Sequence, residues 1–464
     1  MPQENKKKER VKKMIKFGKW VVKFRIPILI LSFLLLIPTG IIYMNTRINY
    51  DILSYLPGDI ETMKGQDILL DEFGTGAFSV AVIDGMQEKE ISQLEDKLKE
   101  IDHVKDVLWY GALADISIPM DMLPDDLKDS LQNADTGSQL MIITFDTSMS
   151  ADETLDAIEE IRGLTNEQCL LSGMSAVVTD IKKICNSEVI MYVVIAAGLS
   201  ALVLALTMDS FLLPFIFLLS IGMAIVYNLG TNFIAGEISF VTQALAAVLQ
   251  LAVTMDYSIF LWHSYLENQE RYPDDRKRAM SHAISQTLTS VVGSSITTIA
   301  GFLAMCFMTF TLGMDLGVVM AKGVVFGVIG CVTILPSMIL AMDKWIEKTR
   351  HKAIIPDLGR IGGFVTKHYW IFIILFLVII GPAFYGQNHN QVYYDLMGTL
   401  PDNLESVKAG NALENDFDMG ATHVILASSD LNSKDARNLE NEISDVDGVK
   451  LALGLDSVMG PTVP

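Results

Sequence analysis

The sequence has few charged residues and few cysteines for its length. Only 19% of its 464 residues are charged, whereas soluble domains average roughly 25%. Its four cysteines, at positions 169, 185, 306 and 331, lack the paired spacing of a disulfide framework or a zinc site. Lys and Arg number 35 against 55 Asp and Glu, which gives a net charge of −20. This acidic balance argues against a nucleic-acid partner, because nucleic acids attract basic surfaces.

Enzyme signatures are also missing. The sequence has no phosphate-binding loop after a strand, no Gly-x-Ser-x-Gly turn and no His-Glu-x-x-His helix. His263 stands alone at the end of an apolar block, and we interpret it as a solvated residue at a membrane surface. We therefore expect no catalytic residue, no metal site and no cofactor. Any transport would then have to be driven by an ion gradient or by a partner protein.

Apolar residues are abundant. They make up 50% of the chain and give it a mean hydropathy of +0.37. They lie in blocks long enough to cross a bilayer, which takes about 20 residues of helix. The predicted membrane spans are 26–44, 189–208, 211–230, 238–262, 290–311, 314–342 and 369–387. The fold class is therefore a multi-pass α-helical membrane protein, with a six-helix bundle followed by a seventh span.

The distribution of charge predicts how the spans are oriented. Residues 1–25 carry ten Lys and Arg against two Glu, and residues 343–368 carry six Lys and Arg against three acids. Basic segments next to spans stay in the cytoplasm, so we expect a cytoplasmic N-terminus and a cytoplasmic linker at 343–368. No small-x-small cleavage site follows Met44. The block at 26–44 is therefore predicted to be a retained span rather than a cleaved signal.

Residues 48–187 are predicted to form a folded domain outside the membrane. They hold 28 acidic residues against nine Lys and Arg. We interpret this charge as a solvated surface, and capture of cations or substrate is the alternative. The pattern of strands and helices is β-α-β-β-α-β, the order of a ferredoxin-like unit. The elements are expected at 78–84, 89–101, 104–110, 140–146, 151–162 and 168–172, with a polar insert around Pro119 and Pro124.

The sequence repeats itself at an offset of 344 residues. Tyr50–Pro57 aligns with Tyr394–Pro401. Seven further residues recur without a gap: Gly18 at Gly362, Val21 at Val365, Lys23 at Lys367, Glu61 at Glu405, Lys64 at Lys408, Phe73 at Phe417 and Gly76 at Gly420. We expect the strand at 78–84 to recur at 422–428 and the helix at 89–101 to recur near 433–445. The seventh span thus restarts the first, and 388–464 starts a second outside domain.

The repeat also predicts what the sequence would need in order to be complete. Pro464 aligns with Met120, in the middle of the outside domain. A ferredoxin-like unit that stops after its first β-α-β would leave half of its sheet unpaired. We therefore expect the chain to be a fragment of a protein with two six-span halves, the second supplied by the same protein or by a partner subunit. The alternative is a natural short product with a vestigial tail.

One carboxylate is expected inside the membrane. Asp256 lies in the fourth span, where a charge at the helix centre costs about 2.5–3.5 kcal/mol on insertion scales. A carboxylate kept there at such a cost can bind and release a proton. Gln250, Thr254 and Tyr257 fall near one helical face, from which Asp256 is turned by about 100°. The alternative is that Asp256 lies near a membrane edge and reaches the headgroups.

Two neighbouring spans carry polar residues that could meet this face. Lys322 lies within the apolar sixth span, and a carboxylate is its natural counter-ion, so an Asp256–Lys322 pair is one hypothesis and a snorkelling Lys322 its rival. The fifth span carries a stripe of hydroxyl residues: Thr287, Ser290, Ser294, Thr297 and Thr298. Such a stripe can hold helices together by hydrogen bonds, or it can line a proton path with Gln250 and Thr254.

The five spans in 189–342 contain two further patterns. Residues 267–288, between the fourth and fifth spans, are predicted to form one charged amphipathic helix on the cytoplasmic surface. The sixth span contains two Gly-x-x-x-Gly motifs, at Gly313 to Gly317 and at Gly323 to Gly327. These motifs allow helices to approach closely.

With its repeat and its span pattern, the chain resembles the MMPL group of the resistance-nodulation-division (RND) transporter superfamily. The local strings that carry the resemblance are Asp256-Tyr257, Leu56-Pro57 to Phe73-Gly74, and Ala321-Lys322-Gly323 to Leu335-Pro336. The resemblance implies a twelve-span exporter of lipids or other hydrophobic molecules in the bacterial cytoplasmic membrane, driven by the proton gradient. Its outside domains would be porter domains, Asp256 the proton-binding carboxylate and Tyr257 its relay companion. A second Asp-Tyr pair, expected near position 600, is not in this sequence.

Two other functions stay open at this point. A SecDF-like protein-export accessory shares the architecture of the superfamily, and an acidic outside domain would suit contact with a translocating chain. A sterol-sensing-like membrane sensor or scaffold would not transport and would tolerate the loss of Asp256. The expected partners are membrane lipids and a hydrophobic substrate, and the expected assembly is a homotrimer or another oligomer.

Overall fold

The computed structural model describes residues 2–109, 111, 131–133, 135–351, 359–390, 397–420, 422–428, 430–450, 452 and 454. These residues form two compact units. Unit 1 comprises Met1–Asn49 and Asn186–Tyr394, and unit 2 comprises Tyr50–Cys185 and Asp395–Pro464. Some sequence features lie outside the described residues: Tyr110, the prolines Pro119 and Pro124, the repeat string at 394–396, and the aligned pair Met120 and Pro464.

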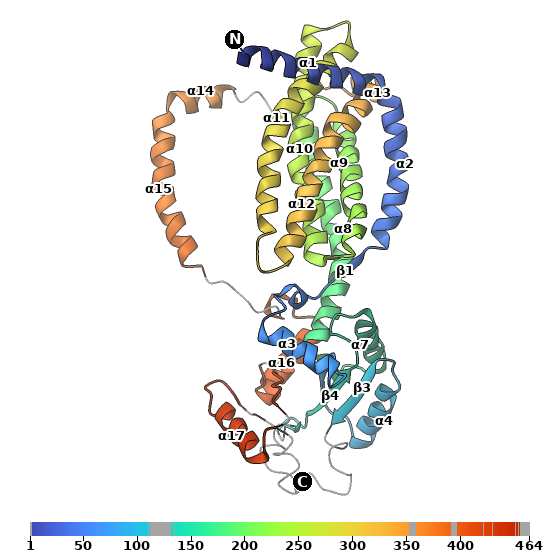
Figure 1. Cartoon of the computed structure of the whole chain (residues 1–464), viewed down its shortest axis with the longest axis vertical. Coiled ribbons are helices and arrows are strands. Elements are labelled where there is room, and N and C mark those ends of the chain that lie inside the picture. The colour runs from blue at the N-terminus through green and yellow to red at the C-terminus, as the bar shows by residue number, and fades with distance from the viewer. Residues whose placement is uncertain are drawn as a thin grey trace. The chain divides into compact units, whose positions relative to one another are not determined.

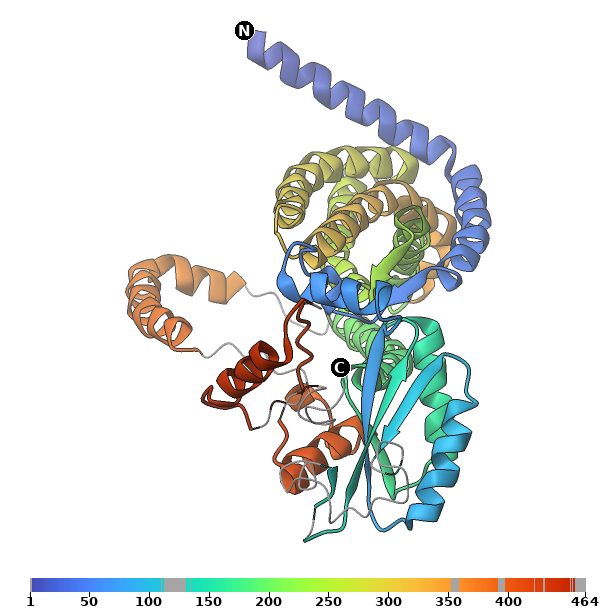
Figure 2. The ribbon, with the colours of Figure 1, turned by 60° about the horizontal axis from the view of Figure 1, so that its bottom comes forward.

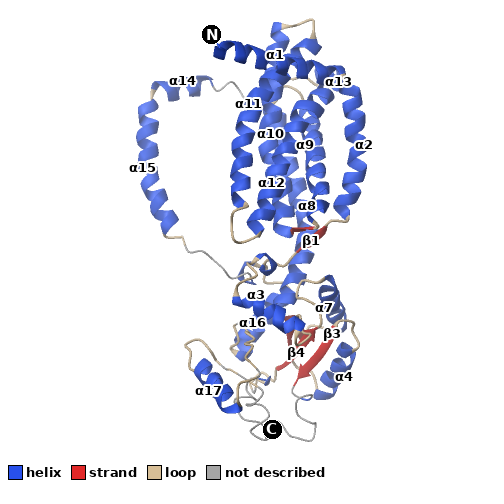
Figure 3. Ribbon diagram, in the orientation of Figure 1, coloured by secondary structure: helices blue, strands red, loops and turns tan. Residues whose placement is uncertain are grey.

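Unit 1 is helical apart from two short strands (Figures 1 and 3). Among the described residues, seven helical stretches are long and apolar enough to cross a membrane. They are α2 (Arg25–Met44), α8 (Met174–Thr207), α9 (Leu213–Gly230) with η3 (Thr231–Ala235), α10 (Phe240–Arg271), α11 (Arg276–Met305), α12 (Leu312–Ile329) with η4 (Gly330–Ile334) and α13 (Leu335–Lys348), and α15 (Tyr369–Asn388). The remaining elements are α1 (Pro2–Lys23), α14 (Gly359–Lys367), β1 (Arg47–Asn49) and β6 (Glu237–Ser239).

The connection between α10 and α11 differs from the prediction for the amphipathic helix and from that for the fifth span. The single amphipathic helix expected at 267–288 is wrong, because α10 ends at Arg271 and α11 begins at Arg276. Pro273 cannot donate a backbone hydrogen bond, and the Asp275 carboxylate accepts one from the Arg278 backbone N–H at 2.9 Å, which starts a new helix. The fifth span is therefore displaced from the predicted 290–311, since α11 already ends at Met305.

The inner helices of unit 1 approach one another at glycines. A side-chain carbon at Gly323 would lie 2.7 Å from Asn228 Nδ2 and 3.0 Å from Gln250 Oε1. A side-chain carbon at Gly327 would collide with the methyl group of Thr254. The second Gly-x-x-x-Gly motif thus brings the backbone of α12 against polar side chains of α9 and α10. Beyond it the helix continues through the π-helical turn η4, directly before Pro336 in α13.

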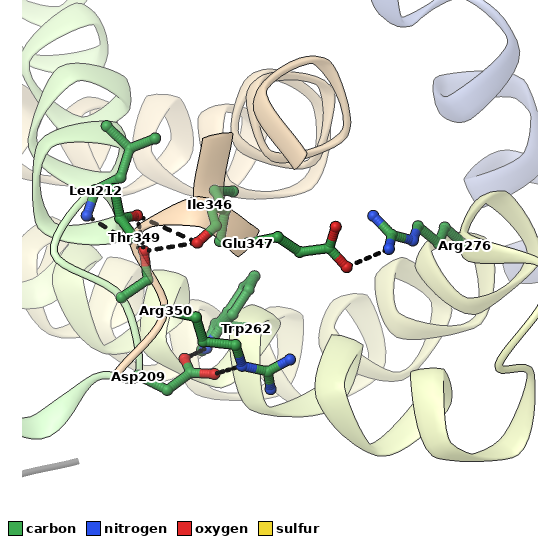
Figure 4. Close-up of polar contacts among 9 residues, drawn as sticks. Asp209, Leu212, Trp262, Arg276, Ile346, Glu347, Thr349 and Arg350 are labelled. Carbon is green, nitrogen blue, oxygen red and sulfur yellow. Dashed lines mark hydrogen bonds and ion pairs between the residues drawn. The ribbon is translucent and has the colours of Figure 1, made fainter. Parts of the chain in front are cut away.

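Different hydrogen bonds fix the two ends of α10. At its start, β6 pairs in parallel with β1, and the Asp315 carboxylate accepts hydrogen bonds from Ser239 N at 2.9 Å and from Thr242 Oγ1 at 2.5 Å. Near its far end, Trp262 Nε1 donates to Asp209 Oδ1 at 3.0 Å, as Figure 4 shows. An anion at a helix N-terminus is electrostatically favourable, so Asp315 also stabilises the start of α10.

The network in Figure 4 joins the α8–α9 connection to the end of α13. Asp209 Oδ2 accepts from Arg350 Nε at 3.0 Å, and the hydroxyls of Ser210 and Thr349 lie 2.7 Å apart. On α11, Arg276 forms ion pairs with Asp343 and Glu347 of α13. These contacts hold α8, α10, α11 and α13 together at one end of the bundle.

Unit 2 contains an antiparallel sheet with the strand order β3-β4-β2-β5 (Figure 3). Its elements in chain order are η1 (Leu53–Tyr55), α3 (Glu61–Asp71), β2 (Ala77–Ile83), α4 (Glu88–Lys99), β3 (Val104–Trp109), β4 (Gln139–Phe145), α7 (Asp152–Leu164), β5 (Cys169–Ser172), η5 (Met397–Thr399), α16 (Glu405–Phe417) and α17 (Ser433–Ser444). From β2 to β5 this is the order β-α-β-β-α-β. The strands are short apolar runs, and β2 is buried at almost every position, whereas the helices α4 and α7 bury one face each.

The two faces of this sheet are covered by different parts of the chain. On β2, Ala77, Ala81 and Ile83 face a core shared with α4 and α7. The alternate residues Val80 and Val82 face the other way and pack with Leu413 and Phe417 of α16. Figure 2 shows α16 across the sheet from α4. The second face is thus covered by a helix from a distant part of the sequence.

The second copy of the repeat is only partly regular. Helix α17 (Ser433–Ser444) lies near the predicted 433–445. The strand predicted at 422–428 is wrong for this structure, because these residues form no ladder. A strand needs a neighbour, and β2 finds its neighbours in β4 and β5. No described residue pairs with 422–428 in the same way.

Candidate functional site

The candidate site centres on α10, whose two faces differ in exposure. Gln250 and Thr254 are buried, each with 2% of its surface exposed, and Tyr257 is buried as well. Asp256 is exposed. In an α-helix, successive side chains are rotated by about 100° around the helix axis. Asp256 and Tyr257, although adjacent in sequence, therefore belong to different faces of the helix.

Asp256 lies halfway along α10 in a stripe of exposed apolar residues. Leu249 lies two turns before it and Phe260 one turn after it, and both are more than a third exposed. The Asp256 carboxylate has no hydrogen-bond or ion-pair partner among the described residues. Within a membrane span an ionised carboxylate is costly unless water or a partner meets it. The carboxylate on this face is therefore left to water or to a group outside the described residues.

Tyr257 connects α10 to the hydroxyl stripe of α11. Its side chain hydrogen-bonds with Ser294 and Thr298. Its backbone carbonyl accepts from Cys331 Sγ at 3.3 Å, which ties it to the π-helical turn η4. Tyr257 is thus held between two helices, with its hydroxyl one residue away from the exposed carboxylate.

The stripe on α11 is divided between two environments. Ser290, Ser294 and Thr297 are exposed, and the Thr297 hydroxyl donates back to the Ser294 carbonyl at 2.6 Å. Thr287 is completely buried. Thr298 and Ser294 are the members that the structure brings to Tyr257. The exposed members extend a polar surface along α11 within an otherwise apolar bundle.

Lys322 does not meet Asp256. Lys322 Nζ donates to Asn232 Oδ1 instead, and the two charged groups form no ion pair in the described part of the chain. The reason is the rotation of α10: α12 packs against its Gln250 and Thr254 face, through Gly323 and Gly327, and not against its Asp256 face. The hypothesis of a direct Asp256–Lys322 pair is wrong for this structure.

Lys322 belongs to a buried cluster of amides that the sequence analysis missed. Asn228 Nδ2 donates to Gln250 Oε1 at 3.0 Å, and Asn228, Asn232 and Gln250 are each at most 2% exposed. Three amide atoms in this cluster have no hydrogen-bond partner among the described residues: Asn228 Oδ1, Asn232 Nδ2 and Gln250 Nε2. The sequence did contain a signal for this cluster: Asn228 and Asn232 lie one helical turn apart at the end of an apolar span.

The polar residues predicted from the sequence therefore form two groups on opposite sides of α10. The first group lies on exposed surface and consists of Asp256, Ser290, Ser294 and Thr297. The buried Tyr257 contacts this group through Ser294. Gln250 and Thr254 lie on the buried side, which α12 and Lys322 cover. One helix links the two groups, so a rotation of α10 would move both.

Comparison with known proteins identifies the family. The model of the MMPL family matches residues 74–368, more than half of the chain, and this range includes both groups of the site. The chain belongs to the MMPL family. This family is part of the RND superfamily, and together with the seven apolar stretches it establishes a multi-pass membrane protein.

Relatives of this MMPL chain are longer than it is. The probable transport protein MmpL12 of Mycobacterium tuberculosis is 24% identical over 412 residues, which cover 84% of this chain and 34% of the relative. The putative membrane protein SCO5905 of Streptomyces coelicolor is 22% identical, over 72% of this chain and 42% of the relative. The chain thus spans less than half the length of the curated relatives it matches.

Among solved structures, the crystal structure of SecDF in its super-membrane-facing form aligns with 70% of this chain and 39% of its own. The sequence identity is 14% and the TM-score 0.38. A likeness of this size carries no argument about function.

Proposed function

We propose that this MMPL chain is part of a proton-driven exporter of lipids or other hydrophobic molecules across the bacterial cytoplasmic membrane. One observation carries the proposal: the exposed carboxylate of Asp256 lies midway along a helix able to span a membrane. Family membership supports transport, and one relative is named a probable transport protein. The proton is the proposed coupling ion because a lone carboxylate binds it without other ligands.

The proposed proton step begins at Asp256. In the ionised state its carboxylate needs water or a partner, supplied in our proposal by a helix of the second half or of a partner subunit. Protonation removes the charge and weakens that contact, so the helices can shift. The membrane potential contributes about 2.3 kcal/mol per charge per 100 mV, which can bias two states that differ by a few kcal/mol. Tyr257 would relay the proton or hold α11 in place through Ser294.

The buried side of α10 supplies the second part of the proposal. Because Gln250 and Thr254 fit against the glycines of α12, a turn of α10 cannot occur without moving α12. Lys322 directly precedes Gly323 on α12 and is held by Asn232. In this account Lys322 takes part in coupling through helix movement and not through an ion pair with Asp256.

The proposed orientation places α1 in the cytoplasm and unit 2 outside. The ten basic residues of 1–25 support the first assignment by the positive-inside rule. Unit 2 would be a porter domain of the ferredoxin-like type. The antiparallel strand order β3-β4-β2-β5 supports this fold, since it places the first and third strands of the β-α-β-β-α-β unit side by side at the centre.

A small cleft in unit 1 supports a hydrophobic substrate or lipid partner. Its volume is about 100 Å³, and three helices line it: Val193, Ala196 and Ala197 of α8, Leu218, Gly222 and Ile225 of α9, and Ala247, Val248 and Leu251 of α10. All of these residues are apolar, so the cleft suits hydrocarbon and offers no hydrogen bond to a polar group. A side-chain carbon at Gly222 would have no atom within 4 Å, which marks open space.

Proton flux in liposomes tests the central proposal. The protein expressed from its native gene is reconstituted with a pH-sensitive dye inside, and a pH gradient is imposed. We expect the wild type and Asp256→Glu, which keep a carboxylate, to move protons, and Asp256→Asn to reduce the flux to that of empty liposomes. A wild-type flux in Asp256→Asn would refute proton coupling at this residue and favour the non-transporting sensor.

Bound lipid tests the cleft. Gly222→Leu fills the open space, whereas Gly301→Leu adds the same side chain to α11, at another site with no atom within 4 Å. We expect Gly222→Leu to lower the amount of co-purified lipid seen by native mass spectrometry and Gly301→Leu to leave it unchanged. Equal lipid in both variants would contradict occupation of the cleft by hydrocarbon.

A further inference from the structure

The start of this inference is the way α1 packs on the bundle of unit 1. Figure 1 shows α1 crosswise to the bundle helices, at the end where α10 meets α11. A side-chain carbon at Gly18 would collide with the Ser281 carbonyl of α11. Val21 and Val22 are at most 5% exposed and belong to the core of the bundle. One face of α1 is therefore fixed tightly against unit 1.

The opposite face of α1 carries a stripe of lysines. Four of them follow one another at spacings of four, three and four residues: Lys12, Lys16, Lys19 and Lys23. These spacings place the four side chains within about 60° around the helix axis. All four are exposed, and none forms an ion pair with another described residue. Like charges one turn apart repel one another, so the stripe is complementary to an anionic surface.

A row of aromatic side chains borders the lysine stripe. The ring centroids of Phe17 and Trp20 lie 6.2 Å apart, and those of Trp20 and Phe24 lie 5.5 Å apart. Trp20 is 50% exposed and Phe24 37% exposed. Exposed aromatic rings beside lysines are typical of helices that lie in a membrane interface, with the rings towards the acyl chains and the ammonium groups among the phosphates. The stripe and the row together favour a lipid surface over a soluble anion.

The bundle adds further basic groups next to Lys19. The guanidinium of Arg278 lies 4.4 Å from the centre of the Tyr272 ring, and that ring lies 5.1 Å from the ring of His282. The charges of Arg278, Lys19 and Arg271 are all close enough to act on His282. Cations from α1, α10 and α11 therefore gather around one pair of aromatic rings.

The acidic residues between α10 and α11 do not neutralise this group. Glu267 pairs with Arg271 at 2.6 Å, and the Asp275 carboxylate accepts from the backbone of Arg278 rather than from its guanidinium. Two more exposed acids of the connection form no ion pair in the described part of the chain: Glu270 and Asp274. The side chains of Lys19 and Arg278 form none there either. Two cations from different helices thus remain uncompensated side by side.

We infer that Lys19 and Arg278 bind the phosphate of an anionic phospholipid in the leaflet next to α1. An ammonium and a guanidinium both donate charge-assisted hydrogen bonds to phosphate oxygens, and basic pockets between membrane helices suit such headgroups. The acyl chains of this lipid lie along the aromatic row that contains Trp20. The bound lipid joins α1 to α11 beside the close contact at Gly18. The inference rests on this end of unit 1, and it does not depend on proton coupling.

Native mass spectrometry tests the site on the protein expressed from its native gene and purified in detergent. Phosphatidylglycerol or phosphatidylcholine with the same acyl chains is titrated, and the bound copies are counted at each concentration. We expect the wild type to bind phosphatidylglycerol several-fold more tightly than phosphatidylcholine. Lys19→Gln combined with Arg278→Gln should abolish this preference. Lys19→Arg combined with Arg278→Lys keeps both charges and should retain it.

A matched variant controls for the loss of two positive charges. Lys64→Gln combined with Lys97→Gln removes two exposed lysines of unit 2 and should leave the lipid preference unchanged. The inference is overturned if the wild type does not distinguish the two lipids, or if Lys19→Gln with Arg278→Gln prefers phosphatidylglycerol as strongly as the wild type. Displacement of phosphatidylglycerol by an equal concentration of soluble glycerol phosphate would overturn the assignment to a lipid.

Thermal unfolding in detergent gives a second readout. A ligand that binds only the folded state raises the unfolding temperature, so phosphatidylglycerol should raise that of the wild type more than phosphatidylcholine does. The difference between the two lipids should disappear in Lys19→Gln with Arg278→Gln and persist in Lys19→Arg with Arg278→Lys. An undiminished difference in the glutamine variant would contradict binding at this site.

Discussion

The exposed and buried faces of α10 place polar groups in different surroundings. On the buried face, Gln250 and Thr254 are fitted against glycines of α12, and a neighbouring amide holds Gln250. On the exposed face, Asp256 stands among apolar side chains. Amides in a packed contact fix the distance between helices, whereas the exposed carboxylate is the group to which we assign the proposed proton step. The comparison teaches that polar residues of one span can have entirely different surroundings, so polarity alone does not assign a role.

The largest expected effect is on folding, when a carboxylate is placed on the buried face instead of the exposed face. Thr254→Asp places a charge at a site with 2% exposure, against α12, and burying an unpaired ion costs several kcal/mol. Ala252→Asp places the same charge on the exposed face, one turn from Asp256. We expect Thr254→Asp to abolish the monodisperse peak in fluorescence-detected size exclusion and Ala252→Asp to retain it. Equal behaviour would show that the two faces do not differ in burial.

The glycine contact should show the next largest effect. Gly327→Leu forces a side chain into the space occupied by Thr254, and overpacking of this kind costs about 1–3 kcal/mol. We expect a lower thermal unfolding temperature in detergent for Gly327→Leu, with Gly301→Leu close to the wild type because open space surrounds that position. A wild-type unfolding temperature for Gly327→Leu would mean that α12 does not pack tightly on α10.

Lys322→Gln separates charge from hydrogen bonding on the buried side. Glutamine can still donate to Asn232 but carries no charge. If the charge takes part in coupling, as proposed, proton flux should fall several-fold while the unfolding temperature changes little. Wild-type flux in Lys322→Gln would restrict Lys322 to a positioning role. Lys322→Met is the matched variant that also removes the hydrogen bond and should lower stability.

Tyr257→Phe should give the smallest effect. It removes only the hydroxyl that bonds with Ser294 and Thr298, and a hydrogen bond of this kind contributes about 0.5–1.5 kcal/mol. We expect a modest loss of thermal stability and a proton flux reduced by less than tenfold. A flux as low as that of Asp256→Asn would instead make the Tyr257 hydroxyl an obligatory carrier of the proton.

Much of the architecture could be predicted from local pattern. The apolar blocks indicated the membrane-spanning helices, and alternating strands with amphipathic helices indicated the element order of unit 2. The helical period alone predicted that Asp256 and Gln250 lie on different faces of α10. These features depend on residues near one another in the sequence, which is why a single sequence contains them.

Three features were predicted wrongly, and two of them depend on neighbours in space. The break after Arg271 is set by Pro273 and the cap at Asp275, where composition alone suggested a continuous amphipathic helix. Lys322 bonds with Asn232 because α12 meets the other face of α10, and sequence does not fix that rotation. The sequence of 422–428 has the pattern of a strand, but no strand among the described residues pairs with it. The errors at Lys322 and at 422–428 arose where a partner in space decides the outcome, whereas the error at Arg271 arose because the composition of the segment outweighed a local proline and cap.

The protonation of Asp256 is the most direct test of the account. Infrared difference spectra between neutral and acidic pH, recorded on the protein in membranes, report the carbonyl band of a carboxylic acid. Because the other Asp and Glu residues also protonate, the account predicts that the band in the wild type and in Lys322→Gln exceeds the band in Asp256→Asn by the contribution of one carboxyl group. An identical band in Asp256→Asn would show that the titrating group lies elsewhere, and the proposed role of the exposed face would be wrong.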